Sequence, residues 1–152
     1  MKCPNLYTLV LLFTIISVTA YSQNPNGSKP ALFSNLPEKI SCPESELNRI
    51  FSSTVDQHIS LAFSDKFLFS GTVTSNVVKY PNLQTAVIKS PVFGDAIFAV
   101  SKITNADKSI SYIGRIINKK YFDGYELRKD ALNNYQLVKI ETDKVIQDCS
   151  QN

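Results

Sequence analysis

The feature that most constrains the fold is a two-residue alternation of apolar and polar side chains in the middle of the chain. Between residues 67 and 77 apolar residues and one glycine recur at every second place except position 75, with mainly Ser, Thr and Asn between them. Successive side chains of a β-strand point to opposite faces, so this period predicts a strand with one dry and one wet face. Such strands are typical of antiparallel sheets. The residues expected on the dry face are Phe67, Phe69, Gly71, Val73 and Val77.

Further short apolar runs follow one another along the chain, separated by turn-forming residues and without a helical pattern between them. They cover residues 58–63, 83–89, 96–100, 110–118, 125–129 and 135–139. Regular spacing of this kind predicts a mainly β, α+β domain, built as an antiparallel meander of about seven strands. The meander forms either an open sheet or a small barrel.

Several residues predict details of the meander. Residues 96–100 are apolar at every position, which favours a central strand, and Gly114 indicates a possible bulge. The pair Asp123-Gly124 predicts either a tight turn or a bulge. Residues 125–129 and 135–139 are near copies, so we expect them to be the two arms of a hairpin around residues 130–134.

One short helix is expected before the strands, over residues 43–53. Ser41 and Glu44 match a capping box, and Pro43 falls in the first turn, where its missing N–H costs nothing. An apolar stripe at helical spacing would pack this helix on the sheet. The core expected from both patterns comprises Leu47, Ile50, Phe51, Leu61, Phe67, Phe69, Val73, Ile97, Phe98, Val100, Ile113 and Ile116.

The N-terminus has the pattern of a secretory signal peptide over residues 1–22. Lys2 precedes a ten-residue, mostly apolar run over residues 9–18, and small residues then offer a cleavage site after Ala20 or Ser22. The run is too short to span a bilayer, which takes about 20 apolar residues. We therefore expect an exported protein, periplasmic or secreted, with no membrane span in the mature chain. A flexible tether over residues 23–36 would lead into a single β-rich domain over residues 37–152.

Two cysteines remain after this processing, Cys42 and Cys149. In an exported protein such a pair indicates a disulfide, which would close a loop of about 100 residues. The chain-entropy model gives such a loop roughly 4.7 kcal/mol of stabilisation. Two unpaired thiols are the alternative, because sequence separation does not determine whether the two residues meet.

No catalytic, metal or cofactor site emerges from the residue pattern. His58 is the only histidine, which excludes sites built from two or three histidines. No serine lies in a G-x-S-x-G elbow, and single aspartates do not match calcium-loop spacing. An enzyme is therefore the less favoured interpretation. Its one concrete version is a small secreted hydrolase that uses His58 with a nearby carboxylate, Asp56 or Asp65.

A local charge bias points instead to a ligand face. Residues 115–139 carry six cationic and three acidic side chains, with tyrosines interleaved, and aromatic residues beside cations can stack on ligands and hold anions. The structural alternative is that Tyr favours strands and Lys protects sheet edges. The residues expected on this face are Tyr112, Lys119, Lys120, Tyr121, Tyr125, Arg128, Lys129 and Tyr135.

The layout of signal peptide, polar tether and compact β-rich domain resembles that of small exported proteins of Gram-negative bacteria. The function expected from the sequence is an exported, non-enzymatic binding or interaction domain, acting at the cell envelope. Its partner would be an envelope or extracellular protein or a glycan. Nucleic acid is not expected, because an exported protein rarely meets it.

Overall fold

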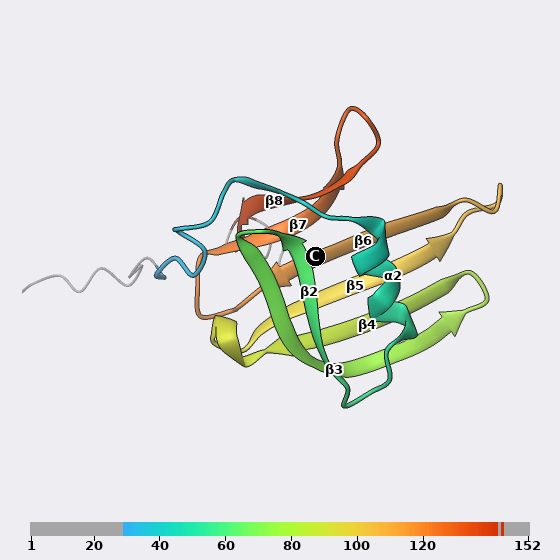
Figure 1. Ribbon diagram of the computed structural model, residues 1–152, viewed down its shortest axis with the longest axis horizontal. Helices are drawn as coiled ribbons and strands as arrows, with labels where there is room; N and C mark the ends of the chain where they lie inside the picture. The colour runs from blue at the N-terminus through green and yellow to red at the C-terminus, as the bar shows by residue number, and fades with distance from the viewer. Residues whose placement is uncertain (1–28, 143, 145–152) are drawn as a thin grey trace, which may run out of the picture.

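The computed structural model describes residues 29–142 and 144, and within them eight strands form one antiparallel sheet (Figure 1). The predicted mainly β meander of about seven strands, with one helix packed on it, is confirmed. The strands are β1 (Lys39–Ser41), β2 (His58–Ser64), β3 (Phe67–Tyr80), β4 (Leu83–Ser90), β5 (Ala96–Thr104), β6 (Ile110–Ile117), β7 (Asp123–Lys129) and β8 (Tyr135–Glu141).

The sheet is nearly closed and barrel-like. Strands β2 to β8 pair with their neighbours in chain order, and β1 then adds to the free edge of β8, with Ile40 opposite Leu137. The chain thus begins the sheet at one edge and ends it one strand away from the same edge. The long strand β3 bends, so that β2 lies across the front of the molecule in Figure 1. Sheet closure leaves an inner face that encloses the core and an outer face.

A bulge in β3 changes which side chains face inward. Val73 pairs with Ile88 but Ser75 pairs with Val87, so Thr74 is an extra residue and the alternation shifts by one place beyond it. Val77 is therefore 48% exposed, and its expected place on the dry face is wrong. The bulge instead turns Asn76 toward the helix.

Helix α2 (Glu44–Ser52) packs its apolar stripe on the inner face of the sheet, with Leu47, Ile50 and Phe51 buried. Its position matches the predicted range, but the predicted capping box does not form. Pro43 is the N-cap and no side chain caps the helix, because Ser41 is held in β1 opposite Gln136. Ser41, which the local sequence predicted as the helix cap, is therefore part of a strand instead.

The carbonyl end of α2 is capped by amide side chains from the sheet. The Asn76 amide nitrogen donates to the carbonyl of Ser53 at 2.7 Å and to that of Phe51 at 3.1 Å. Gln84 of β4 donates to the Asn76 side-chain oxygen at 2.8 Å. The last carbonyls of a helix lack partners within it, so these contacts fix where α2 sits on the sheet.

The predicted core is buried except for Ile97 and Ile113, which are 40% and 56% exposed. In β5 Phe98 and Val100 point inward, so Ile97 must point outward. In β6 the inward positions are Tyr112, Gly114 and Ile116, which leaves Ile113 on the outer face. Ile97 and Ile113 were assigned to the wrong face of their strands. When apolar residues occupy both faces of a strand, the sequence alone does not show which face points into the core.

Both glycine predictions are also corrected. Gly114 sits in the regular ladder opposite Val100, where a Cβ would lie 2.8 Å from the carbonyl oxygen of Ala99, so close strand approach rather than a bulge requires it. Asp123 and Gly124 open β7 and form no turn. The hairpin between residues 125–129 and 135–139 is confirmed, with Leu127 opposite Leu137.

The segment before β1 packs against the sheet. Phe33 is fully buried against the rings of Phe67, Phe93 and Tyr125. The carboxylate of Asp123 accepts the backbone N–H groups of Leu32 and Phe33 at 2.6 and 2.8 Å. Leu32 and Phe33 therefore pack on the core within residues 23–36, the range predicted as a flexible tether. Residues 1–28, with the predicted signal peptide, lie outside the described residues.

Candidate functional site

The eight residues of the predicted ligand face lie in different environments. Tyr112, Tyr125 and Tyr135 point inward and are buried in the core, whereas Lys119, Lys120, Arg128 and Lys129 are exposed and Tyr121 is half-buried. Alternation along β7 places Arg128 on the opposite face from Tyr125, and Lys119 and Lys120 lie in the turn after β6, whereas Lys129 shares the face of its cross-strand partner Tyr135. One local contact joins the two kinds, since the Lys129 ammonium lies 4.9 Å from the centre of the Tyr135 ring. The structure does not bring all eight residues onto one exposed face.

The three buried tyrosines hold parts of the fold together. Strands β6 and β7 pair only through Arg115 and Ile116, so the N–H of Tyr112 lies beyond their ladder and donates to the Tyr135 hydroxyl at 2.9 Å. The Tyr112 hydroxyl donates to Asn48 of α2 at 2.6 Å. Burial, and then the charge of Glu44, raise the pKa of Tyr112.

Tyr125 links the N-terminal segment to the sheet by a hydrogen bond from its side chain. Its hydroxyl donates to the carbonyl oxygen of Pro37 at 2.6 Å, and burial, with the charges of Glu38 and Asp123, raises its pKa to about 12. These hydroxyls are used inside the protein and offer no free group to a ligand.

The most prominent concave surface lies on the outer face of β4 to β7, and we call it the outer hollow. Its volume is about 930 Å³. Its lining follows from the strand register as three cross-strand rows. Lys89, Ile97 and Ile117 form the first row; Val87, Ala99, Arg115 and Glu126 form the second; Thr85, Ser101 and Ile113 form the third.

The floor of the outer hollow is aliphatic. Val87, Ile97, Ala99, Ile113 and Ile117 all contribute to it, and the small Ala99 lies at the centre of the three rows. Within residues 29–142 and 144, no aromatic side chain lines the hollow. Pockets for small ligands are typically apolar, with volumes of roughly 300–1,000 Å³ and a few placed polar groups. The outer hollow matches that description.

The rim is predominantly cationic. Lys79, Lys89, Arg115, Lys119 and Lys120 line it together with Asp95 and Glu126, a surplus of three positive charges. Lys89 pairs with Asp95 at 3.3 Å. Among the described residues Lys79, Lys119 and Lys120 have no ion-pair partner. Two residues of the predicted ligand face, Lys119 and Lys120, thus border the outer hollow.

Glu126 organises the flank of the hollow. It accepts hydrogen bonds from Arg115 at 3.0 and 2.8 Å and from Arg128 at 2.5 Å. Partial burial acts to raise the pKa of Glu126, but hydrogen bonds and charges from the two arginines outweigh it, so the pKa lies below its ordinary value. The carboxylate is therefore ionised and offsets one of the two arginine charges on this side of the rim.

The sequence contained a signal for this surface. A run that is apolar at both faces, as over residues 96–100, indicates a central strand, and β5 does lie between β4 and β6. The same run also places Ile97 and Ala99 on the outer face, beside Ile113 and Ile117. Because Ile97 and Ile113 were assigned to the core, the apolar patch on the outer face was not predicted.

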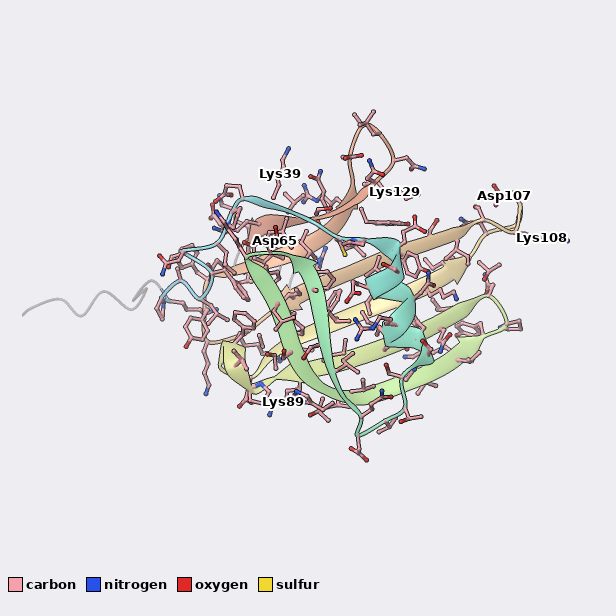
Figure 2. All side chains as sticks on the ribbon, in the orientation of Figure 1. Lys39, Asp65, Lys89, Asp107, Lys108 and Lys129 are labelled. Carbon is pink, nitrogen blue, oxygen red and sulfur yellow. The ribbon has the colours of Figure 1, made fainter. Side chains whose placement is uncertain are left out.

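The hydrolase alternative gains no geometric support. His58 is exposed at the start of β2, and within the described chain it forms no ion pair or side-chain hydrogen bond with Asp56 or Asp65. Asp65 lies at the tip of the β2–β3 turn in Figure 2. Among residues 29–142 and 144, no three His, Cys, Asp or Glu side chains are grouped to hold a metal ion.

Cys42 lies between β1 and α2, is buried, and forms no disulfide with any of the described residues. Burial, with the nearby charge of Glu46, raises its pKa to about 12. Cys149 lies outside the described residues, so the disulfide between Cys42 and Cys149 stays a prediction.

No protein-family model, curated protein or solved structure matches this chain. Within the described residues, no helix has the length and apolar character needed to cross a membrane.

Proposed function

We propose that this protein is an exported, non-enzymatic binding domain whose ligand occupies the outer hollow. The observation that carries the proposal is the aliphatic floor, which is exposed on the outer face although the core itself is complete on the inner face. Exposed contiguous apolar surface rimmed by polar groups marks binding sites on soluble proteins. The cationic rim supplies the groups that orient a ligand.

Export is part of the proposal and is supported by the signal-peptide pattern of residues 1–22. The partner expected from the sequence was an envelope or extracellular protein or a glycan. The volume of the outer hollow, about 930 Å³, favours a small molecule, or a segment of similar size within a larger ligand.

The test is a comparison of two alanine-to-leucine variants. Ala99→Leu fills the centre of the floor, and Ala62→Leu makes the same change at an exposed position of the edge strand β2. Each processed, folded protein is incubated with envelope and secreted fractions of its source cells, and bound proteins, glycans and small molecules are identified by mass spectrometry.

We expect a ligand that binds the wild type and Ala62→Leu and is lost from Ala99→Leu. Both variants should unfold at the same temperature as the wild type, because both substituted positions are exposed. Equal retention by Ala99→Leu and Ala62→Leu would show that the outer hollow is not the binding site.

A further inference from the structure

The outer hollow carries three of its four lysines at one end. Its first row begins with Lys89, and Lys119 and Lys120 follow Ile117 of the same row after one intervening residue, Asn118. The third row, two steps further along the strands, presents Ile113 beside Thr85 and Ser101. Three of the four lysines thus lie at one end, whereas Lys79 of β3 lies beyond Thr85 at the end that carries Ile113, and the aliphatic floor lies between them.

The distance between these ends suits a short chain. Rows on one face of a sheet are two residues apart, so three rows span about 13 Å along the strands. The floor between them is made of Ala99 and its aliphatic neighbours Val87, Ile97 and Ile117. A flexible hydrocarbon chain can lie along such a floor and bury its methylene groups, each worth about 0.8 kcal/mol.

The chemistry of the lining argues against rings. Sugars and nucleobases are held by stacking on aromatic faces, and the described residues place none in the outer hollow. Its aliphatic floor favours an alkyl group, and its unpaired lysines favour an anionic headgroup.

We propose that the ligand of the outer hollow is a single-chain anionic amphiphile of the fatty-acid type. Its carboxylate binds Lys119 and Lys120 beside the Lys89–Asp95 pair, and its chain runs over Ala99 toward Ile113. This inference deepens the proposed function and rests on it.

The first experiment is titration calorimetry of the processed protein with three probes below their micelle concentrations. Decanoate carries both the chain and the carboxylate, decyltrimethylammonium carries the same chain with the opposite charge, and acetate carries the carboxylate alone. We expect saturable binding of decanoate, binding of the cation at least roughly tenfold weaker, and none of acetate. Added salt should weaken decanoate binding, because exposed ion pairs are screened.

Variants locate the two ends of the ligand. Ala99→Leu should abolish decanoate binding, while Ala62→Leu should leave it unchanged. The double variant Lys119→Gln/Lys120→Gln should weaken binding roughly tenfold, as expected for losing two exposed ion pairs. Its matched control is Lys66→Gln/Lys108→Gln, at exposed positions outside the hollow. Figure 2 shows Lys108 at the tip of the β5–β6 loop, far from Lys89.

Three results would overturn the inference. Equal binding of decanoate and decyltrimethylammonium would remove the role of charge. Binding of anionic lipid vesicles without binding of monomeric decanoate would indicate a membrane surface as the partner. No binding of decanoate, with capture of another ligand still lost in Ala99→Leu, would leave the proposed function intact and the ligand class wrong. If Ala99→Leu altered neither decanoate binding nor capture, the proposed function would fail as well.

Discussion

The carboxylate of Asp123 holds Phe33 in the core, with Oδ2 accepting the Phe33 backbone N–H at 2.8 Å across 90 residues of chain. Its other oxygen accepts the N–H of Leu32 at 2.6 Å. The neighbouring Phe122 donates its N–H to the carbonyl of Pro30 at 3.1 Å. The start of β7 therefore binds the N-terminal segment, and Phe33 closes one end of the core as a result.

We expect Asp123→Ala to lower the free energy of unfolding by about 2–4 kcal/mol, because two N–H groups lose their acceptor and that of Phe33 is buried. Asp123→Asn keeps one acceptor oxygen and should cost less. Urea unfolding measures both, with the exposed Asp65→Ala as control. A loss no greater than that of Asp65→Ala would contradict this role for Asp123.

The amide cap on α2 predicts a second loss. Asn76→Ala leaves the Ser53 and Phe51 carbonyls without their side-chain donor, and we expect it to lower the free energy of unfolding by about 1–2 kcal/mol. Amide exchange in α2 should also quicken. Asn82→Ala, in the exposed β3–β4 turn, is the control. Unchanged exchange in α2 would show that packing alone positions the helix.

The raised pKa of Tyr125 predicts a loss of stability at high pH. Unfolding releases this hydroxyl to its ordinary pKa of 10.0, whereas burial in the folded protein raises the pKa to about 12. The folded state therefore holds the proton longer, and the contribution of Tyr125 is complete below about pH 10 and declines as the pH rises toward 12.

Tyr125→Phe isolates this contribution. At neutral pH the variant should be less stable by about 1 kcal/mol, because the Pro37 carbonyl loses its donor. The difference from the wild type should shrink between pH 10 and 12. Urea unfolding across this range measures it, and a difference that stays constant with pH would be the contrary result.

The predicted disulfide gives a further test. In processed protein purified without reductant, we expect no thiol to react with iodoacetamide even in denaturant, and both cysteines to react after reduction. In reduced but folded protein Cys42 should react slowly, since burial raises its pKa to about 12. Reactive thiols in unreduced, denatured protein would favour the alternative of two unpaired cysteines.

If the bond is present, Cys149→Ser should lower the free energy of unfolding by up to about 4.7 kcal/mol, the chain-entropy value for a loop of this size. Cys42→Ser would be a poorer probe, because Cys42 is itself buried and its replacement also changes the packing around β1 and α2.

Prediction from sequence succeeded where the pattern was local. Alternation identified the strands, and the spacing of Leu47, Ile50 and Phe51 located α2. Prediction failed where the local sequence was compatible with two structural roles for the same residue. Ser41 was a good helix cap and a good strand residue, and only its pairing with Gln136 decided between them. Tyr112 was compatible with either face of β6, and the phase of that strand placed it inside.

The candidate site was predictable only in part. Lys119 and Lys120 were named from charge, and they border the outer hollow. The aliphatic floor was not named, because Ile97 and Ile113 are indistinguishable from core residues until the facing strands are known. The hollow is shaped by register across four strands, and register depends on contacts between distant parts of the chain.

The sequence by itself determined the kind of fold, because alternation and turn residues act within a few positions and each strand carries its own signal. Tertiary structure decided which apolar residues are inside, since the Thr74 bulge and the pairing of β5 with β6 set the phase of each face. It also decided how α2 is positioned on the sheet, through Asn76. These outcomes depend on residues that meet only after the sheet has closed, and no local pattern contains that information.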